Sequence, residues 1–308
     1  MIEILLSTFN GERYLAQQLD SVLLQECREW RLTARDDGSS DGTVTLLQRY
    51  AQQSGGRIRI SDDSGENLGA CRSFARLLER STAQYLMFCD QDDVWFPGKV
   101  ARTFAKLKEL EEKYGKETPL LVFSDASVAD ADLALLAPSM WEYQHSAPEI
   151  ATRMNRLLLM NPANGCTMLF NRALAEAALP VPAEALMHDS WLVLVACALG
   201  KVGYLPEPTL LYRQHGGNES VTKRWGSAYV AAQLANLGAA RHYQTLLQRQ
   251  AGALLERYRG EIAPSAATLL SAYAGLGSRG ILGKRIDILR HRLFYVGAVR
   301  NIGWLLTC

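Results

Sequence analysis

Three carboxylates stand within four consecutive positions of the chain, directly after the apolar run Tyr85 to Cys89. They are Asp90, Asp92 and Asp93, with Gln91 between them. Carboxylates this close raise one another's pKa, and a cation removes that cost. Asp oxygens are hard ligands suited to Mg²⁺ or Mn²⁺, and Mg²⁺ usually binds one or two protein carboxylates plus substrate phosphates. The segment therefore predicts a divalent metal site, and a solvated acidic turn is the alternative.

Three further polar segments could take part in chemistry. Two follow apolar runs: Ser7 to Glu12, typical of a turn, and Asp36 to Gly42, typical of a Ser/Asp helix cap with glycine turns. The third, His188 to Trp191, places the carboxylate of Asp189 at the start of an apolar helix, where a capping aspartate is the alternative. Each of the first two segments, taken alone, is better explained as a turn or a helix cap than as a binding site. Their position in the fold therefore has to decide between the two explanations.

The elements that position these segments alternate between strand and helix. Apolar runs predict strands at 2–8, 30–35, 57–61 and 84–89, and amphipathic patterns predict helices through 14–23, 42–53 and 71–79. Helices of about a dozen residues between strands imply parallel crossovers and a doubly wound sheet. Ligands bind such sheets outside the carboxyl ends of the strands. The polar segments that follow the strands are therefore expected to meet at one edge.

The second half of the chain predicts a mixed sheet followed by helices. Strands are expected at 120–124, 165–170 and 202–205, and a strand-like run at 211–215 leads into a glycine loop. A long helix is expected over 227–257. Further helical pattern, interrupted by glycines, extends over 266–306.

The composition is that of a soluble globular protein. The 308 residues include 33 Lys and Arg against 32 Asp and Glu, with 48% hydrophobic residues, which excludes a disordered, collagen-like or coiled-coil chain. The six cysteines form no CxxC pair and no Cys/His cluster, so we expect neither a zinc site nor a disulfide framework. The N-terminus lacks a signal-peptide pattern, and the longest apolar run, Trp191 to Leu199, is half a membrane span. We expect a cytoplasmic protein.

The charge is unevenly distributed along the chain. Residues 201–308 carry 14 Lys and Arg against 5 Asp and Glu, a balance of +9, which leaves −8 for residues 1–200. Between 279 and 300, basic residues outnumber the single acid Asp287 and alternate with apolar ones; they are Arg279, Lys284, Arg285, Arg290, Arg292 and Arg300. This pattern predicts an amphipathic segment lying on an anionic surface, the inner face of the cytoplasmic membrane. The alternative is that the apolar stripe packs onto the catalytic part or a second subunit, with the arginines in water.

Taken in order, the polar segments resemble the family 2 glycosyltransferases with the GT-A fold, over roughly residues 2–218. The resemblance rests on the segments Ser7 to Gly11, Arg35 to Thr43, Glu66 to Gly69, Cys89 to Pro97, His188 to Trp191 and Tyr212 to His215. It implies an α/β fold with a Rossmann-like doubly wound mixed sheet in residues 1–218. A nucleotide-sugar half would cover about 1–100 and an acceptor half about 101–218, and residues 219–308 would form a helical C-terminal extension.

The resemblance also implies roles for individual residues. The nucleotide-binding positions would be Thr8, Glu12, Asp36, Asp37, Asp90 and Gln91, the metal ligands Asp92, Asp93 and His215, the diphosphate contact Arg213, and the acceptor contacts Gly165, His188 and Trp191. Asp189 would be the general base, because a sugar hydroxyl is a weak nucleophile whose proton has to leave as the new bond forms. The metal, Mg²⁺ or Mn²⁺, would stabilise the leaving nucleoside diphosphate. A single displacement would invert the anomeric carbon.

The substrate follows from the same resemblance. The segments His188 to Trp191 and Leu211 to Asn218 look most like bacterial rhamnosyltransferases of O-antigen and capsule assembly, which implies a dTDP-L-rhamnose donor and a lipid-linked or oligosaccharide acceptor. A UDP-sugar is the alternative donor, because uracil presents the same hydrogen-bonding edge as thymine.

Two other classes of protein fit less well. A sugar nucleotidyltransferase would have a glycine-rich, basic loop after the first strand, and a non-catalytic sugar-nucleotide-binding scaffold would lack the base or metal carboxylates. The basic C-terminal part contains no recognisable nucleic-acid-binding module, so no nucleic-acid partner is expected.

Overall fold

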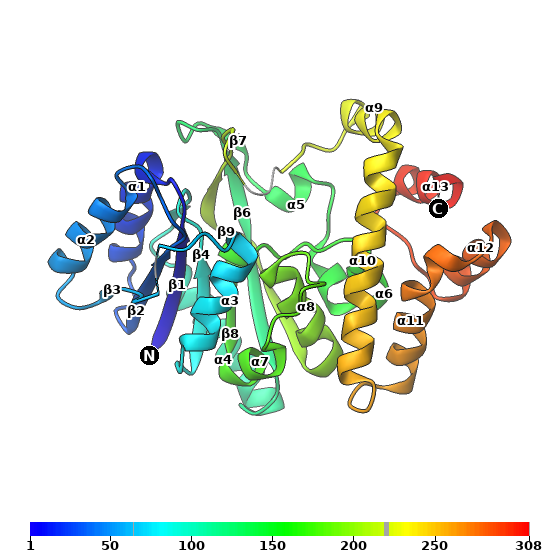
Figure 1. Cartoon of the computed structure of the whole chain (residues 1–308), viewed down its shortest axis with the longest axis horizontal. Coiled ribbons are helices and arrows are strands. Elements are labelled where there is room, and N and C mark those ends of the chain that lie inside the picture. The colour runs from blue at the N-terminus through cyan, green and yellow to red at the C-terminus, as the bar shows by residue number, and fades with distance from the viewer. Residues whose placement is uncertain (64, 219–221, 308) are drawn as a thin grey trace.

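The computed structural model describes residues 1–63, 65–218 and 222–307, and within them a nine-stranded sheet runs through the molecule (Figure 1). The strand order is β3-β2-β1-β4-β8-β6-β9-β5, with β7 paired to β6. The strands are β1 (Ile2–Thr8), β2 (Trp30–Asp36), β3 (Ile58–Ile60), β4 (Tyr85–Cys89), β5 (Val94–Trp95), β6 (Leu120–Ala129), β7 (Leu135–Ala137), β8 (Met168–Asn171) and β9 (Lys201–Arg213). Strands β1 to β4 pair with one another in parallel, and β6 pairs with β9 in parallel. Strand β8 is antiparallel to its two neighbours, β4 and β6. The prediction of a doubly wound mixed sheet is confirmed.

The first half of the molecule follows the sequence pattern closely. The crossover helices α1 (Glu12–Leu23), α2 (Thr43–Gln53) and α3 (Ala70–Arg80) begin and end near the predicted bounds. Side chains of β1 alternate between two apolar clusters: Ile4 and Leu6 join the one that contains α1 and α2, and Leu5 joins the one that contains α3. Both faces of the sheet are therefore covered, which is why Ile4, Leu5 and Leu6 follow one another in β1 without polar alternation.

The later strands differ from the sequence-based bounds. The run 165–170 begins as a 3₁₀ turn, Gly165–Thr167, and becomes strand only at Met168. β9 is one continuous strand through Pro206 and Pro208, where the sequence predicts two runs. It pairs with β6 beyond residue 124, and the register shifts between Ser124 and Asp125. This shift leaves Pro206 in a bulge, where the missing N–H of proline breaks no ladder bond.

Helices complete the fold and form its C-terminal end. They are α4 (Lys99–Tyr114), α5 (Met140–Tyr143), α6 (Met154–Leu157), α7 (Arg172–Ala178), α8 (His188–Leu199), α9 (Ser227–Ala235), α10 (Leu237–Tyr258), α11 (Pro264–Ala274), α12 (Ile281–Arg290) and α13 (Ala298–Thr307), with 3₁₀ turns at Pro148–Thr152 and Leu276–Ser278. The single helix predicted over 227–257 is divided at Asn236, whose backbone leaves the helical region (φ −127°, ψ 47°).

The C-terminal helices share a core with the sheet domain. α10 stands between the sheet and α11 to α13 (Figure 1), and its Leu254 belongs to one apolar cluster with Trp191 of α8 and Leu270 of α11. The domain boundary near residue 218 stays a prediction, since residues 219–221 lie outside the described ones. In the described part of the chain, no helix combines the length and the apolar character needed to cross a bilayer.

Candidate functional site

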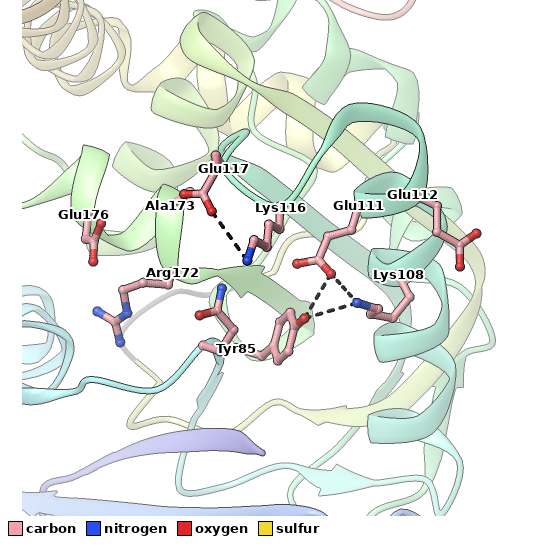
Figure 2. A pocket seen from close by; sticks show the side chains of 10 residues that line it. Tyr85, Lys108, Glu111, Glu112, Lys116, Glu117, Arg172, Ala173 and Glu176 are labelled. Atoms are coloured by element: carbon pink, nitrogen blue, oxygen red, sulfur yellow. Dashed lines mark hydrogen bonds and ion pairs between the residues drawn. The ribbon is translucent and has the colours of Figure 1, made fainter.

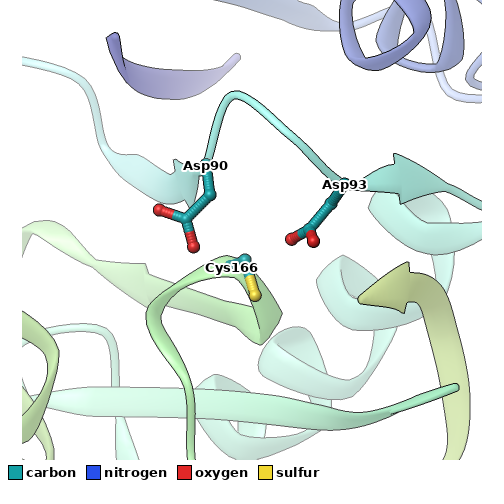
Figure 3. Close-up of side chains that lie close together, drawn as sticks. All are labelled: Asp90, Asp93 and Cys166. Atoms are coloured by element: carbon teal, nitrogen blue, oxygen red, sulfur yellow. The ribbon is translucent and has the colours of Figure 1, made fainter. Parts of the chain in front are cut away.

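The acidic loop after β4 turns two of its three carboxylates toward one point. Figure 3 shows Asp90 and Asp93 directed at Cys166, which lies in the turn Gly165–Thr167, and one ligand atom from each of the three lies within 4.8 Å of the others. Burial, and then the neighbouring charge of Asp92, raise the pKa of Asp90 to about 7 and the pKa of Asp93 well above its usual value. Asp93 Oδ2 is buried and has no hydrogen-bond partner among the described residues. A divalent cation would neutralise this pair of carboxylates, so the residues fit a metal ion.

Asp92 faces a different neighbour. Its Oδ2 accepts hydrogen bonds from His215 Nε2 (2.8 Å) and from Asn218 Nδ2 (3.2 Å). The second ring nitrogen, His215 Nδ1, accepts from the backbone N–H of Gly217 (3.1 Å). The predicted metal ligands Asp92, Asp93 and His215 are thus not gathered into one set, because Asp92 and His215 contact each other while Asp93 faces Asp90.

Arg213 cross-links three parts of the chain. Its side chain is 2% exposed, and its Nε and Nη1 donate to the carbonyl oxygens of Asp92 and Ala131, both at 2.7 Å. Its Nη2 donates to Gln17 Oε1 (2.6 Å), and the guanidinium lies over the ring of Tyr14, 4.6 Å from its centroid. Each nitrogen of the Arg213 guanidinium therefore donates one hydrogen bond within the protein, and its predicted contact with a diphosphate stays a prediction.

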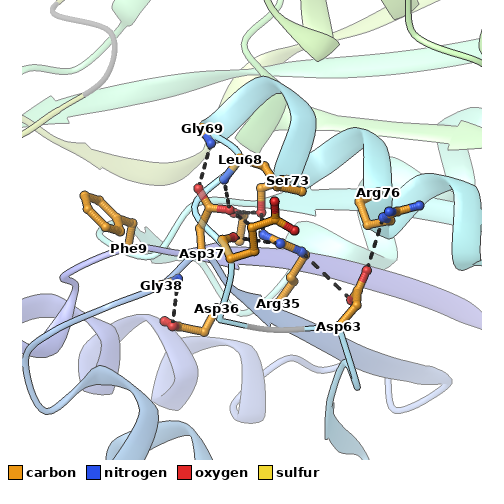
Figure 4. Close-up of polar contacts among 12 residues, drawn as sticks. Phe9, Arg35, Asp36, Asp37, Gly38, Asp63, Leu68, Gly69, Ser73 and Arg76 are labelled. Atoms are coloured by element: carbon orange, nitrogen blue, oxygen red, sulfur yellow. Dashed lines mark hydrogen bonds and ion pairs between the residues drawn. The ribbon is translucent and has the colours of Figure 1, made fainter.

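The carboxylates after β2 shape their own loop. Asp36 accepts from Thr8 Oγ1 (3.0 Å) and from the backbone N–H groups of Gly38 and Ser39 (3.1 and 2.9 Å). Asp37 turns inward to the guanidinium of Arg35 and, as Figure 4 shows, accepts from the N–H groups of Leu68 and Gly69 at 2.9 and 2.8 Å. Thr8, Asp36 and Asp37 are all at most 2% exposed. They fix the backbone at the carboxyl ends of β1 and β2.

Two further predicted nucleotide contacts join neighbouring loops. Glu12 Oε2 accepts from the backbone N–H of Gly42 (2.9 Å), at the start of α2. The side-chain amide of Gln91 forms two hydrogen bonds of 2.9 Å with the backbone of Phe9: its Oε1 accepts from the N–H, and its Nε2 donates to the carbonyl oxygen. The ring of Phe9 is left 47% exposed. Sequence reasoning missed Phe9 and Cys166, because an aromatic residue or a lone cysteine has no signal of its own in a single sequence.

Asp189 lies beside the acidic loop. It is the second residue of α8, after the cap residue Met187, and its Oδ2 accepts from the backbone N–H of Gly165 (2.9 Å). Gly165 precedes Cys166, so the same turn holds Asp189 and faces Asp90, whose pKa the charge of Asp189 also raises. Burial raises the pKa of Asp189 to about 6, against the opposing effect of the N–H groups of Gly165 and Ser190. A carboxylate that titrates near neutral pH suits proton transfer.

His188 and Trp191, the predicted acceptor contacts, lie in the core, and their role at an acceptor stays a prediction. His188 is 5% exposed, stacks on Phe74 (4.2 Å between ring centroids) and meets Phe88 edge-on (4.6 Å). Burial lowers the pKa of His188 to about 3, so the ring stays neutral. Trp191 is fully buried and its Nε1 donates to the carbonyl oxygen of Ala178 (2.8 Å). His188 thus faces α3 and β4, whereas Trp191 faces α7 and the ring of Tyr258 on α10.

A hollow of about 660 Å³ lies at the opposite edge of the sheet (Figure 2). It includes Tyr85 at the start of β4, whereas Asp90 follows the end of the same strand. Its charged lining side chains are Lys108, Glu111, Glu112, Lys116, Glu117, Arg172 and Glu176. Cations and carboxylates there largely compensate one another, as in the pair of Lys108 and Glu111 (2.5 Å). The hollow is therefore not part of the site at the carboxyl ends of the strands.

Comparison with known proteins finds similarity in the N-terminal part of the chain. Residues 3–114 match the family described as Glycosyl transferase family 2. EpsE of Bacillus subtilis (strain 168), which is named as a glycosyltransferase, is 30% identical over 138 residues; these cover 44% of this chain and 49%, about half, of EpsE. The dTDP-rhamnosyl transferase RfbG of Shigella flexneri is 24% identical, over 70% of this chain and 73% of RfbG.

Two solved structures are similar over nearly the whole chain. Residues 1–349 of Staphylococcus aureus TarS, in complex with UDP-GlcNAc, superpose with a TM-score of 0.55 at 15% identity, covering 94% of this chain and 89% of TarS. The mannosyltransferase PcManGT of Pyrobaculum calidifontis, in complex with GDP-Man and Mn²⁺, gives a TM-score of 0.54 at 14% identity, covering 99% and 78%. At this identity the similarity establishes the fold, and it confirms the predicted GT-A class.

Proposed function

We propose that this chain, whose residues 3–114 match glycosyl transferase family 2, transfers a sugar from a nucleotide-sugar donor to a hydroxyl group of an acceptor. The main support is the position of Asp189. One backbone turn, Gly165–Thr167, holds this carboxylate and also faces Asp90 and Asp93. A base with a pKa near neutral thus stands beside the two carboxylates that best fit a metal ion.

In this proposal Asp90 and Asp93 hold Mg²⁺ or Mn²⁺ together with the diphosphate of the donor. When bound, the ion stabilises the negative charge that develops on the leaving nucleoside diphosphate. Cys166 is a soft ligand that suits neither ion, so we assign it to the wall of the site. We assign Asp92, His215 and Arg213 as positioning residues. The side chain of His215 bonds to the carboxylate of Asp92, and the side chain of Arg213 bonds to the backbone carbonyl oxygen of Asp92.

The nucleoside would lie over the loops after β1 and β2. Thr8, Asp36 and Asp37 hold these loops in shape, and the exposed ring of Phe9 offers a face on which a base can stack. The two bonds between Phe9 and Gln91 keep this ring beside the acidic loop.

Asp189 would take the proton of the acceptor hydroxyl as its oxygen attacks the anomeric carbon. The bond from that carbon to the diphosphate oxygen breaks in the same step, so the configuration inverts. Gly165 contributes by orienting Asp189, since its backbone N–H bonds to Oδ2 of the carboxylate.

For the donor we favour dTDP-L-rhamnose, with a UDP-sugar as the alternative. The similarity to RfbG supports rhamnose, and the similarity of fold to TarS, solved with UDP-GlcNAc, supports the alternative. The acceptor would be a lipid-linked or oligosaccharide hydroxyl in bacterial surface polysaccharide assembly. A non-catalytic scaffold is the competing function.

The test measures transfer and donor hydrolysis over a panel of sugar nucleotides, with and without Mn²⁺. Asp189→Asn should keep binding of dTDP or UDP and lose transfer by ~10²-fold or more, as expected for loss of a general base. Asp62→Asn, at a side chain that is 81% exposed, is the matched control. Normal turnover by Asp189→Asn, or no reaction with any donor, would contradict the proposal.

We also propose that the protein attaches to the inner face of the cytoplasmic membrane through α12 and α13. Each helix exposes apolar side chains spaced three and four residues apart: Leu282, Ile286 and Leu289 on α12, and Val299, Ile302 and Leu306 on α13. A hydrogen bond from Arg285 Nε to the carbonyl oxygen of Leu305 (3.3 Å) ties the two helices together. Exposed Arg290 and Arg292 supply positive charge beside the apolar side chains, which favours an anionic lipid surface.

Vesicle co-sedimentation tests this attachment. Leu282→Glu combined with Ile302→Glu should abolish pelleting with vesicles of anionic phospholipid and leave the fold intact, since both side chains are more than half exposed. Leu24→Glu with Leu135→Glu, at similarly exposed positions elsewhere, should pellet like the wild type. Binding that is independent of anionic lipid and salt, or dimerisation lost in the α12/α13 variant, would contradict it.

A further inference from the structure

The C-terminal helices bring a group of aromatic residues toward Asp189. Gln250 of α10 accepts hydrogen bonds through Oε1 from Leu186 N (2.9 Å) and from Ser190 Oγ (3.2 Å). α10 therefore lies against the turn that carries Asp189. Tyr243 precedes Gln250 by seven residues, which places it on the same face, about 10 Å along the axis. Its ring is 53% exposed.

Two other tyrosines lie close to Tyr243. Tyr229 of α9 influences the pKa of Tyr243, and Tyr243 influences the pKa of Tyr295. Burial and then the Asp189 carboxylate, followed by Tyr229, raise the pKa of Tyr243, and Tyr243 and Tyr229 in turn contribute to raising the pKa of Tyr295. We call Tyr229, Tyr243 and Tyr295 the tyrosine cluster.

Hydrogen bonds and ring contacts connect this cluster to its neighbours. Tyr295 OH accepts from Gln244 Nε2 (2.6 Å), and Gln244 Oε1 accepts from Tyr273 OH (3.2 Å). Arg300 stacks on Trp225 at 3.9 Å, and its Nη1 and Nη2 donate to the carbonyl oxygens of His145 and Gln144 (2.6 and 2.7 Å). Trp225 in turn contacts the ring of Tyr229, with centroids 5.1 Å apart. Arg300, expected from the sequence to face water or lipid, thus holds the cluster in place.

The hydroxyls of Tyr229 and Tyr243 are available, since neither has a hydrogen-bond partner among the residues that the structure describes. An aromatic ring with a polar tip suits a sugar, whose C–H face packs on the ring while its hydroxyls bond to the phenol. We propose that Tyr243 and Tyr229 bind the acceptor saccharide and direct one of its hydroxyls at Asp189. This inference rests on the proposed function, and it replaces the predicted acceptor contacts His188 and Trp191.

The experiment compares Tyr243→Ala, Tyr243→Phe and Tyr229→Phe with the wild type, using octyl glycosides of common hexoses and N-acetylhexosamines as acceptors. Tyr243→Ala should raise the acceptor KM at least roughly tenfold, and the two Phe variants should raise it less, because they keep the ring. Donor affinity and donor hydrolysis without acceptor should stay at the wild-type level. Tyr114→Ala, at an exposed tyrosine on α4, is the matched control.

The outcomes separate this inference from the proposed function. A wild-type protein that neither binds nor hydrolyses any donor refutes the proposed function and this inference with it. A wild-type protein that hydrolyses donor but transfers to no glycoside counts against a saccharide acceptor here. An unchanged acceptor KM in Tyr243→Ala overturns the assignment. A loss of donor affinity in that variant also overturns it, because it would place Tyr243 at the donor.

Discussion

Replacing Asp37 by alanine should reduce stability far more than it changes donor recognition. The carboxylate is 2% exposed and accepts two backbone hydrogen bonds, from Leu68 and Gly69. It also pairs with Arg35, which is 1% exposed (Figure 4). Breaking a buried pair from one side costs about 3–5 kcal/mol, because the other charge stays buried without compensation. At roughly 2 °C per kcal/mol, the low end for large domains, a loss of about 4 kcal/mol lowers Tm by roughly 8 °C.

Differential scanning calorimetry measures this change. Asp62→Ala, which removes a carboxylate that is 81% exposed and paired with Arg80, is the control and should cost less than about 1 kcal/mol. Adding Arg35→Met to Asp37→Ala should recover part of the loss, because the uncompensated charge is then gone.

The reasoning is refuted if Asp37→Ala melts within about 2 °C of the wild type. If its affinity for the donor nucleotide falls while Tm is unchanged, Asp37 contacts the ligand instead of positioning the loop. A second substitution that fails to recover stability would show that the lost backbone bonds, and not the charge of Arg35, dominate the cost.

Three further predictions follow from the site and the fold. Because burial raises the pKa of Asp189 to about 6 and the base must be deprotonated, kcat with saturating Mn²⁺ should fall as the pH drops through 6, by roughly tenfold at pH 5; a flat profile would contradict this. Asp93→Asn should weaken Mn²⁺ binding by roughly tenfold or more in calorimetry with nucleotide present, whereas Asp20→Asn, far along α1, should leave it unchanged. Gly200→Ala should destabilise the fold strongly, because its Cβ would lie 1.8 Å from the carbonyl oxygen of Pro119, whereas Gly238→Ala meets nothing within 4 Å; equal urea midpoints for the two would refute this.

The order of strands and crossover helices in the first half could be predicted from the sequence. Its signals are local: the apolar runs of β1 and β4 are buried on both faces, β2 alternates between buried and partly exposed residues, and amphipathic segments lie between the strands. The sequence also places Asp36, Asp90 and their neighbours directly after strands. In a parallel sheet these strand ends share one edge, so the region of the site follows without knowledge of side-chain positions.

Tertiary contacts decided which side chains meet there. Asp90 and Asp93 face Cys166, more than seventy residues away in the chain, while Asp92 between them faces His215. The loop backbone sets these directions, and no periodicity in a single sequence encodes them. The strand bounds near Pro206 could not be predicted for a similar reason, because the register shift against β6 is a property of the pair.

The same distinction applies to the residues around the base. Asp189 could be singled out because it begins an apolar helix, but the sequence does not show which side of that helix faces the sheet. The structure turns His188 and Trp191 into the core and packs α10 beside Ser190, which brings Tyr243 toward Asp189 from over fifty residues away. Local pattern therefore determined the elements and the edge of the sheet. Long-range packing decided which side chains are available there, because burial of a helix face depends on its partner and not on its own sequence alone.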